Sequence, residues 1–142
     1  MLVEEQAYED VTPVARMAAI SPTTVPVHGC FLGTGSGSIF LREVACSTAH
    51  NAEYAGSFLS TASQAPLSRA DWEALHVKCR GVVARFLGTS IERSNDRYSN
   101  IASTISKNFS GGERGVRCFL YLGRSRVSSS AEGRGTTVPA WS

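Results

Sequence analysis

The clearest hydrophobic pattern in the chain lies in residues 68–88. Ser68 is a favourable N-cap with Asp71 three residues later, as in a capping box. Gly88 follows the last apolar pair, where a left-handed C-cap is common. Apolar side chains recur at spacings of three and four, the period of one helix face: Trp72, Leu75, Cys79, Val82, Val83 and Phe86. The pattern predicts one long helix whose apolar face packs on the rest of the domain.

Shorter apolar stretches elsewhere have the length and composition of β-strands. They cover residues 25–32, 39–45, 53–59, 101–109 and 116–122. A glycine- and serine-rich turn at 33–38 leads into a strand and not into a helix, so it does not predict a phosphate-binding loop. In the third stretch, Gly56 and its small neighbours mark a close backbone approach. The chain therefore predicts a small α+β domain: an antiparallel sheet of about five strands with one main helix on one face.

The two ends of the chain depart from this pattern. Residues 1–24 are first acidic and then rich in Ala, Thr and Pro, and residues 123–142 are rich in Ser, Gly and Arg. Such segments bury little apolar surface, so we expect a flexible leader or linker at 1–24, the domain at 25–122 and a disordered tail at 123–142. No apolar run approaches the roughly 18 residues that span a bilayer, and the acidic start is unlike a signal peptide. We expect no membrane anchor to be encoded in this chain.

Composition narrows the class of partner. A chain of 142 residues with 42% hydrophobic content is enough for one domain with a real core. The net charge of +2 arises from 14 basic and 12 acidic residues. These charges are scattered, whereas nucleic-acid-binding domains usually cluster their basic residues on one face. We therefore expect no nucleic-acid partner.

Four cysteines are the most informative feature of the composition: Cys30, Cys46, Cys79 and Cys118. An even number in a small domain predicts two disulfides if the compartment is oxidising. Four cysteines allow three pairings. Their placement favours a Cys30–Cys118 bond between the first and last strands and a Cys46–Cys79 bond from a turn to the helix. Because no export signal is present, a cytosolic interaction domain with reduced thiols remains an alternative.

The turn after the second predicted strand carries the candidate chemistry. A histidine close to a thiol can generate a nucleophilic thiolate, so Cys46 and His50 are a candidate pair for a thiol enzyme. The zinc alternative uses a wider set of ligands: Cys46, His50, Cys79 and Cys118. No third residue is placed to orient the imidazole, and the spacing matches no compact zinc knuckle. We therefore favour a structural interpretation, with Cys46 in a disulfide and His50 binding backbone in the turn, and expect no catalytic residue, cofactor or metal.

Several short segments, taken in the order in which they occur along the chain, resemble the septum-formation domain family of actinobacteria. They are Gly29-Cys30-Phe31, Ala45-Cys46-Ser47, His50-Asn51-Ala52-Glu53, the helical cysteine, and Gly115-Val116-Arg117-Cys118. Family members show glycine–aspartate–cysteine–phenylalanine, proline–cysteine–serine, histidine–aspartate–alanine–glutamate and arginine–valine–cysteine at these places. Three positions depart from the pattern, namely Gly29, Ala45 and Asn51. The resemblance covers residues 25–122.

The resemblance implies an exported domain linked to division or to the cell wall, without established catalytic residues. Family members are typically held outside the cell by a transmembrane helix, which is not carried over to this chain. We expect a non-enzymatic, extracytoplasmic binding or scaffolding domain at the cell envelope, with an envelope protein or a wall polymer as its partner. The candidate functional residues are His50, Asn51 and Glu53. A thiol- or zinc-dependent enzyme centred on Cys46 and His50 is the alternative from another class.

Overall fold

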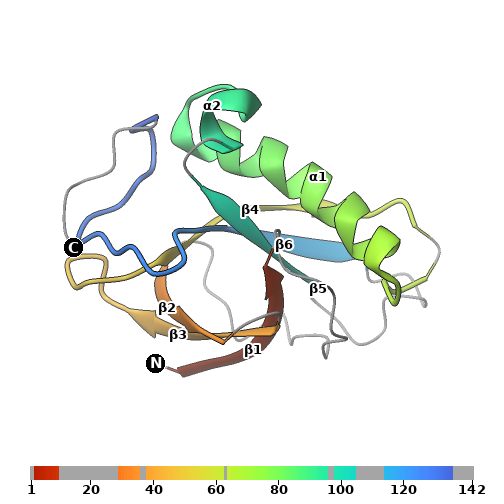
Figure 1. Ribbon diagram of the computed structural model, residues 1–142, viewed down its shortest axis with the longest axis horizontal. Coiled ribbons are helices and arrows are strands. Elements are labelled where there is room, and N and C mark those ends of the chain that lie inside the picture. Colours follow the sequence, from red (N-terminus) through yellow and green to blue (C-terminus); the bar gives the residue numbers. More distant parts are fainter. Residues whose placement is uncertain are drawn as a thin grey trace.

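A computed structural model of the chain describes residues 2–9, 29–35, 38–62, 64–95, 98–104 and 114–135. Six strands and two helices occur in these ranges (Figure 1). They are β1 (Leu2–Glu9), β2 (Cys30–Thr34), β3 (Ser38–Val44), β4 (Ala52–Leu59), α1 (Arg69–Leu87), α2 (Ile91–Asn95), β5 (Ser99–Thr104) and β6 (Gly115–Tyr121). The predicted strand at 101–109 is described only as far as Thr104, and residues 105–109 lie outside the described part.

The strands form a closed antiparallel barrel in the order β1-β3-β2-β4-β6-β5. Helix α1 lies on the outside of the barrel, across β4, β5 and β6 (Figure 1). The α+β class, the antiparallel sheet and the single main helix on one face are therefore confirmed. None of the helices in the described part of the chain is long and apolar enough to span a bilayer.

Strand β1 differs from the expectation for the N-terminal residues. We expected residues 1–24 to lie outside the core as a leader, but Leu2–Glu9 pairs with β3 on one side and with β5 on the other. This strand closes the barrel. The sequence did not predict this strand, because the segment is acidic and lacks the hydrophobic alternation typical of a strand. Its hydrogen-bond partners are backbone groups of two strands that are distant in the sequence.

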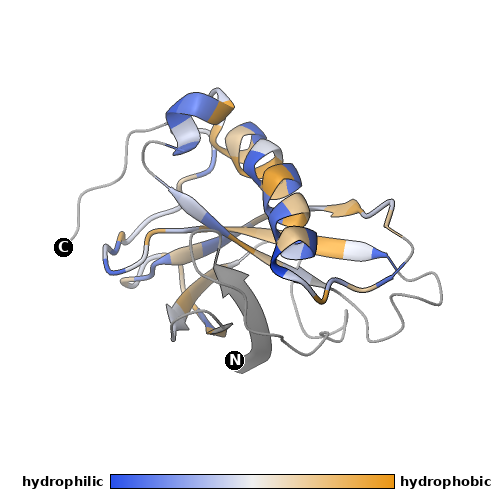
Figure 2. Ribbon diagram, turned by 45° about the vertical axis from the view of Figure 1, so that its right-hand side comes forward, coloured by the Kyte–Doolittle hydropathy of each residue, from blue (hydrophilic) through white to orange (hydrophobic). Residues whose placement is uncertain are grey.

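The core has an inner and an outer layer. The inner layer fills the barrel with side chains from five strands, including an edge-to-face pair of Phe31 and Phe119 with ring centroids 5.5 Å apart. The outer layer lies between α1 and the sheet, where Trp72, Leu75 and Cys79 contact Ala102, Val116 and Cys118. Figure 2 shows the mixture of hydrophobic and hydrophilic residues along α1 that a helix with one buried face requires.

Both predicted caps of α1 are confirmed. The Ser68 side chain accepts a hydrogen bond from the Asp71 backbone N–H, and the Asp71 carboxylate accepts one from the Ser68 N–H. Gly88 has φ = 78°, the left-handed conformation expected at a C-cap. Hydrogen bonds from the backbone N–H groups of Leu67 and Ser68 stabilise the carboxylate, and so lower the pKa of Asp71 from its ordinary value.

Two disulfides are present, but our predicted pairing is wrong. The bonds join Cys30 to Cys46 and Cys79 to Cys118, each with a Cα–Cα distance of 5.2 Å. Cys30 is the cross-strand partner of Val44 at the end of β3, so the following turn returns Cys46 to Cys30. Cys118 on β6 lies beneath the buried face of α1, which carries Cys79. With sequence separations of 16 and 39, the bonds contribute about 3 and about 4 kcal/mol in the chain-entropy description.

The residues after β6 also differ from expectation. We expected a disordered tail at 123–142, yet the C-terminal segment, residues 122–135, returns along the barrel and reaches the end of α1. Its Ala131 packs in a cluster with Val83 and Leu87. The backbone N–H groups of Gly133 and Gly135 donate to carbonyl oxygens in the last turn of α1. These contacts are long-range, which is why a Ser-, Gly- and Arg-rich composition did not predict them.

Candidate functional site

The sequence-predicted residues His50, Asn51 and Glu53 lie where the start of β4 meets the C-terminal segment. His50 exchanges two backbone hydrogen bonds with Val127, at 2.9 and 3.0 Å. Its Nδ1 lies 2.8 Å from the carbonyl oxygen of Thr48. Because a carbonyl oxygen can only accept, Nδ1 is the donor in this contact. The structural interpretation of His50 as a turn residue that binds backbone is confirmed.

The other ring nitrogen of His50 faces the interior. The residue is 1% exposed, and Nε2 has no hydrogen-bond partner among the residues that the structure describes. A general base must reach the group whose proton it takes. In this structure the turn holds the imidazole, and the ring is buried.

Asn51 joins three segments of the chain through its side-chain amide. Its Oδ1 accepts a hydrogen bond of 2.7 Å from the Gly33 N–H on β2. Its Nδ2 donates to the carbonyl oxygens of Gly33 (3.0 Å) and Gly123 (2.8 Å). The residue is only 2% exposed. Two donors and one acceptor are thus used at once, which is the chemistry of an amide and not of an ionised carboxylate.

Glu53 binds the C-terminal segment through its carboxylate. It is 1% exposed, and its Oε1 accepts a 2.8 Å hydrogen bond from the Ala131 N–H. The Ser130 hydroxyl donates to Oε2. Both oxygens accept, which is the pattern of an ionised carboxylate. Glu53 is also the cross-strand partner of Cys30, so its carboxylate lies beside the Cys30–Cys46 disulfide.

The proposed thiol and zinc sites are not assembled as the alternatives required. The sulfur of Cys46 is bonded to Cys30 and is therefore not a thiolate. Cys79 is bonded to Cys118 beneath α1, away from the turn that holds Cys46 and His50. Within the described ranges, one group of possible metal ligands converges, with donor atoms of Cys30, Cys46 and Glu53 within 4.8 Å of one another. Its two sulfurs share a covalent bond, which leaves them poor ligands.

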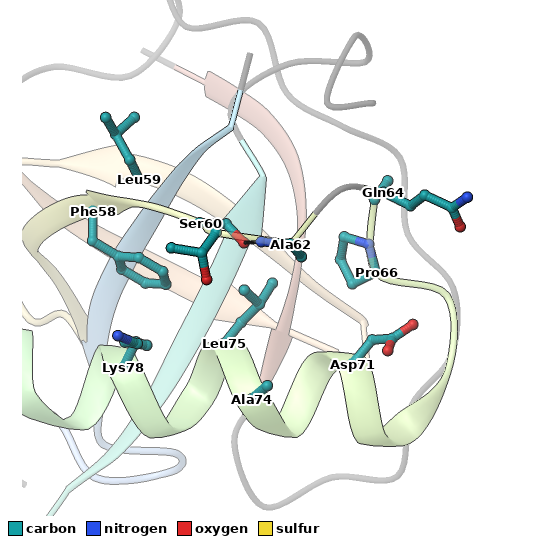
Figure 3. A pocket seen from close by; sticks show the side chains of 12 residues that line it. Phe58, Leu59, Ser60, Ala62, Gln64, Pro66, Asp71, Ala74, Leu75 and Lys78 are labelled. Atoms are coloured by element: carbon teal, nitrogen blue, oxygen red, sulfur yellow. Dashed lines mark hydrogen bonds between the residues drawn. The ribbon is translucent and has the colours of Figure 1, made fainter. Parts of the chain in front are cut away.

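A surface cavity of about 410 Å³ lies between the end of β4, the following loop and α1 (Figure 3). Phe58, Leu75 and Pro66 give it apolar walls, and Asp71 and Lys78 carry its charges. Leu59, at its edge, is 79% exposed. We did not predict this cavity from the sequence. The only local signal is an apolar residue at the end of a strand, which is equally typical of a buried position.

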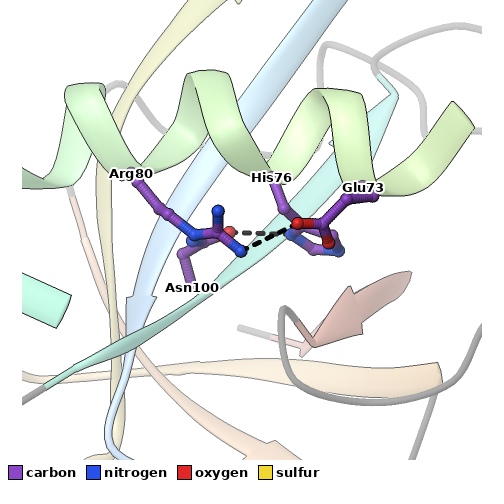
Figure 4. Close-up of polar contacts among 4 residues, drawn as sticks. All are labelled: Glu73, His76, Arg80 and Asn100. Atoms are coloured by element: carbon purple, nitrogen blue, oxygen red, sulfur yellow. Dashed lines mark hydrogen bonds and ion pairs between the residues drawn. The ribbon is translucent and has the colours of Figure 1, made fainter. Parts of the chain in front are cut away.

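A polar contact between α1 and the barrel uses the same turns of the helix but different residues (Figure 4). Nδ1 of His76 lies 2.8 Å from Oδ1 of Asn100 on β5, and both residues are buried. Beside it, Arg80 forms an ion pair of 3.2 Å with Glu73. The pair of His76 and Asn100 fixes the helix over the sheet, which is a structural role.

Comparison with known proteins assigns the chain to a family. A family model described as Septum formation matches residues 4–118, which include β1, all four cysteines and the segment from His50 to Glu53. No curated protein and no solved structure matches the chain. The matched residues cover most of the 142-residue chain. The chain belongs to the septum-formation family.

Proposed function

We propose that this domain is a non-enzymatic binding or scaffolding module that acts in septum formation, outside the cytoplasm, at the envelope of an actinobacterium. Membership in the septum-formation family supports the link to division. The two disulfides support the location, because such bonds persist in oxidising compartments and are rare in a reducing cytosol.

One observation carries the non-enzymatic part of the proposal. The polar side chains that the family motif contributes are directed inward and hold the fold together: His50 binds the turn, Asn51 joins β2 to the C-terminal segment, and Glu53 binds Ser130 and Ala131. The sulfur nearest to His50 in sequence is oxidised. Side chains used in this way stabilise the fold of a binding module and take no part in a reaction.

An envelope protein is the better partner class of the two that we expected. Leu59 and Leu67 are both large and well exposed, at 79% and 62%, and Leu59 borders the cavity beside α1. Exposed apolar residues beside a concave surface are typical of protein–protein contacts.

Complementation in a strain depleted of this protein tests the proposal. His50→Asn keeps a donor close to the position of Nδ1 and removes Nε2, so the turn is retained and an imidazole base is lost. We expect this variant to restore normal septa as well as the wild type does. If the wild type restores normal septa and a folded His50→Asn protein does not, the result would favour the Cys/His enzyme instead.

The location is tested by the thiols of the protein in intact cells. Cells are quenched with acid, the protein is alkylated without reductant, and its mass is measured. We expect no alkylated cysteine in the wild type. Four alkylated cysteines would support the cytosolic alternative with reduced thiols.

A further inference from the structure

The two disulfides differ in how an external reagent can reach them. Cys79 and Cys118 are both 0% exposed and lie in the layer between α1 and the sheet. Cys30 is also 0% exposed, whereas Cys46 is half-buried in the turn after β3. Thiol–disulfide exchange begins when a thiolate attacks one sulfur in line with the bond. Cys46 is the one cysteine of the four that is not fully buried in the folded domain, so an external thiolate reaches its sulfur more readily than the other three.

The group that leaves in this attack is Cys30, and its surroundings oppose the charge that it would acquire. Breaking the bond at Cys46 releases Cys30 as a thiolate inside the barrel wall. The Glu53 carboxylate has an oxygen within 4.8 Å of this sulfur, and strand pairing between β2 and β4 fixes the two residues opposite each other. Two like charges this close repel each other strongly in a protein interior, and a poorly stabilised leaving thiolate slows exchange.

We propose that Cys46 is a site of thiol–disulfide exchange with an external thiol, and that Glu53 restrains this exchange by repelling the thiolate that leaves at Cys30. The external thiolate forms a bond to Sγ of Cys46 as the Cys46–Cys30 bond breaks. The electron pair of that bond goes to Cys30, which then takes a proton from solvent. The products are a mixed disulfide at Cys46 and a free thiol at Cys30. A second external thiol, or the second sulfur of a dithiol protein, completes the reduction of Cys46 and is itself oxidised.

The site of attack is tested on the wild-type chain without any substitution. The oxidised protein is exposed briefly to reduced glutathione under native conditions, quenched with acid, alkylated, and mapped by non-reducing peptide mass spectrometry. We expect the glutathione adduct on Cys46, an alkylated Cys30 and an intact Cys79–Cys118 bond. An adduct on Cys30, or opening of Cys79–Cys118 at an equal rate, would overturn the proposal. A parallel arm with a thioredoxin-type dithiol protein shows whether a small thiol or a protein reductant opens the bond faster.

The role of Glu53 is tested by the rate of the same reaction. Glu53→Gln keeps the shape and can still bind Ser130 and Ala131, but it removes the charge, so we expect exchange to be about tenfold faster. Glu53→Asp keeps the charge and alters the packing, so exchange should stay much closer to the wild-type rate. Glu132→Gln makes the same charge change at an exposed residue of the C-terminal segment and serves as the control. Equal rates for wild type and Glu53→Gln, or equal acceleration in both Glu53 variants, would refute electrostatic restraint.

Discussion

At the scale of single residues, the start of β4 and the residue before it show how buried polar groups are paired. Asn51 satisfies one donor and two acceptors of distant backbone segments. Glu53 accepts from two donors of the C-terminal segment. Buried polar groups are tolerated because each hydrogen bond replaces one that water would otherwise supply. The position of Asn51 is the more informative of the two, since an aspartate there could not donate to Gly33 and Gly123 when ionised.

Asn51→Asp is expected to destabilise the domain at neutral pH. The carboxylate would face two carbonyl oxygens that lose their donor, at a cost of about 2 kcal/mol or more. The folded state would raise the pKa of the introduced carboxyl, so the loss is complete above that raised pKa and shrinks as the pH falls toward about 4, the ordinary value. Urea unfolding at both pH values measures the difference.

The matched control is Asn95→Asp, which makes the same change at an exposed residue at the end of α2. It should leave the unfolding midpoint nearly unchanged. If Asn51→Asp is as stable as wild type at neutral pH, the carbonyl oxygens of Gly33 and Gly123 have other donors and the amide is not required.

At the scale of elements, two glycines illustrate how differently the same residue can be used. Gly56 lies at the irregularity where β4 shifts register against β6, with φ = 144°. An added Cβ there would lie 3.0 Å from Cγ1 of Val82 on α1. Gly81 lies inside α1, and the nearest atom to an added Cβ is 4.0 Å away, on Ile91. The first glycine is required by backbone and packing, and the second is not.

Gly56→Ala should therefore lower the free energy of unfolding by about 1–3 kcal/mol, from backbone strain and from the contact with Val82. Gly81→Ala should raise it by about 0.5–1 kcal/mol, because alanine restricts the unfolded chain and favours the helix. Chemical denaturation of the two variants measures both effects. A stabilising Gly56→Ala would mean that β4 can adopt a regular register beneath α1.

The N-terminus of α1 predicts a pH effect with a definite sign. The folded-state pKa of Asp71 is lowered by the N–H groups that it accepts from. Its contribution to stability is therefore present above the ordinary pKa of 3.8 and is lost as the pH falls through the folded-state value. Asp71→Asn should lower the melting temperature near neutral pH, and the difference from wild type should vanish well below that value. A difference that persists in acid would assign the effect to packing.

At the scale of the whole molecule, the fold is closed by its two ends. Strand β1 completes the barrel between β3 and β5. The C-terminal segment joins the start of β4 to the end of α1 through Val127, Ala131 and Gly133. The central part of the chain, from β2 to β6, supplies the core, and the ends tie its parts together.

Ending the chain at Gly123 should destabilise the domain. The carboxylate of Glu53 would lose its donors from Ser130 and Ala131, at a cost of about 3 kcal/mol or more for hydrogen bonds to a charged group. A chain ending at Gly135 retains every described contact and is the control. Thermal unfolding of both truncations measures the effect, and equal melting temperatures would show that the C-terminal segment does not contribute to stability.

Local physical signals in the sequence determined α1, its two caps, the positions of the central strands and the number of disulfides. Helical hydrogen bonds and capping contacts join residues close together in the chain, so their pattern is visible in Ser68, Asp71 and Gly88. Only the tertiary structure decided the partners of Cys30 and Cys79, the inclusion of β1 in the barrel, and the inward use of Asn51 and Glu53. Each of these depends on which segments, distant in the sequence, lie side by side in the folded domain. The residues next to each position along the chain do not specify that neighbour.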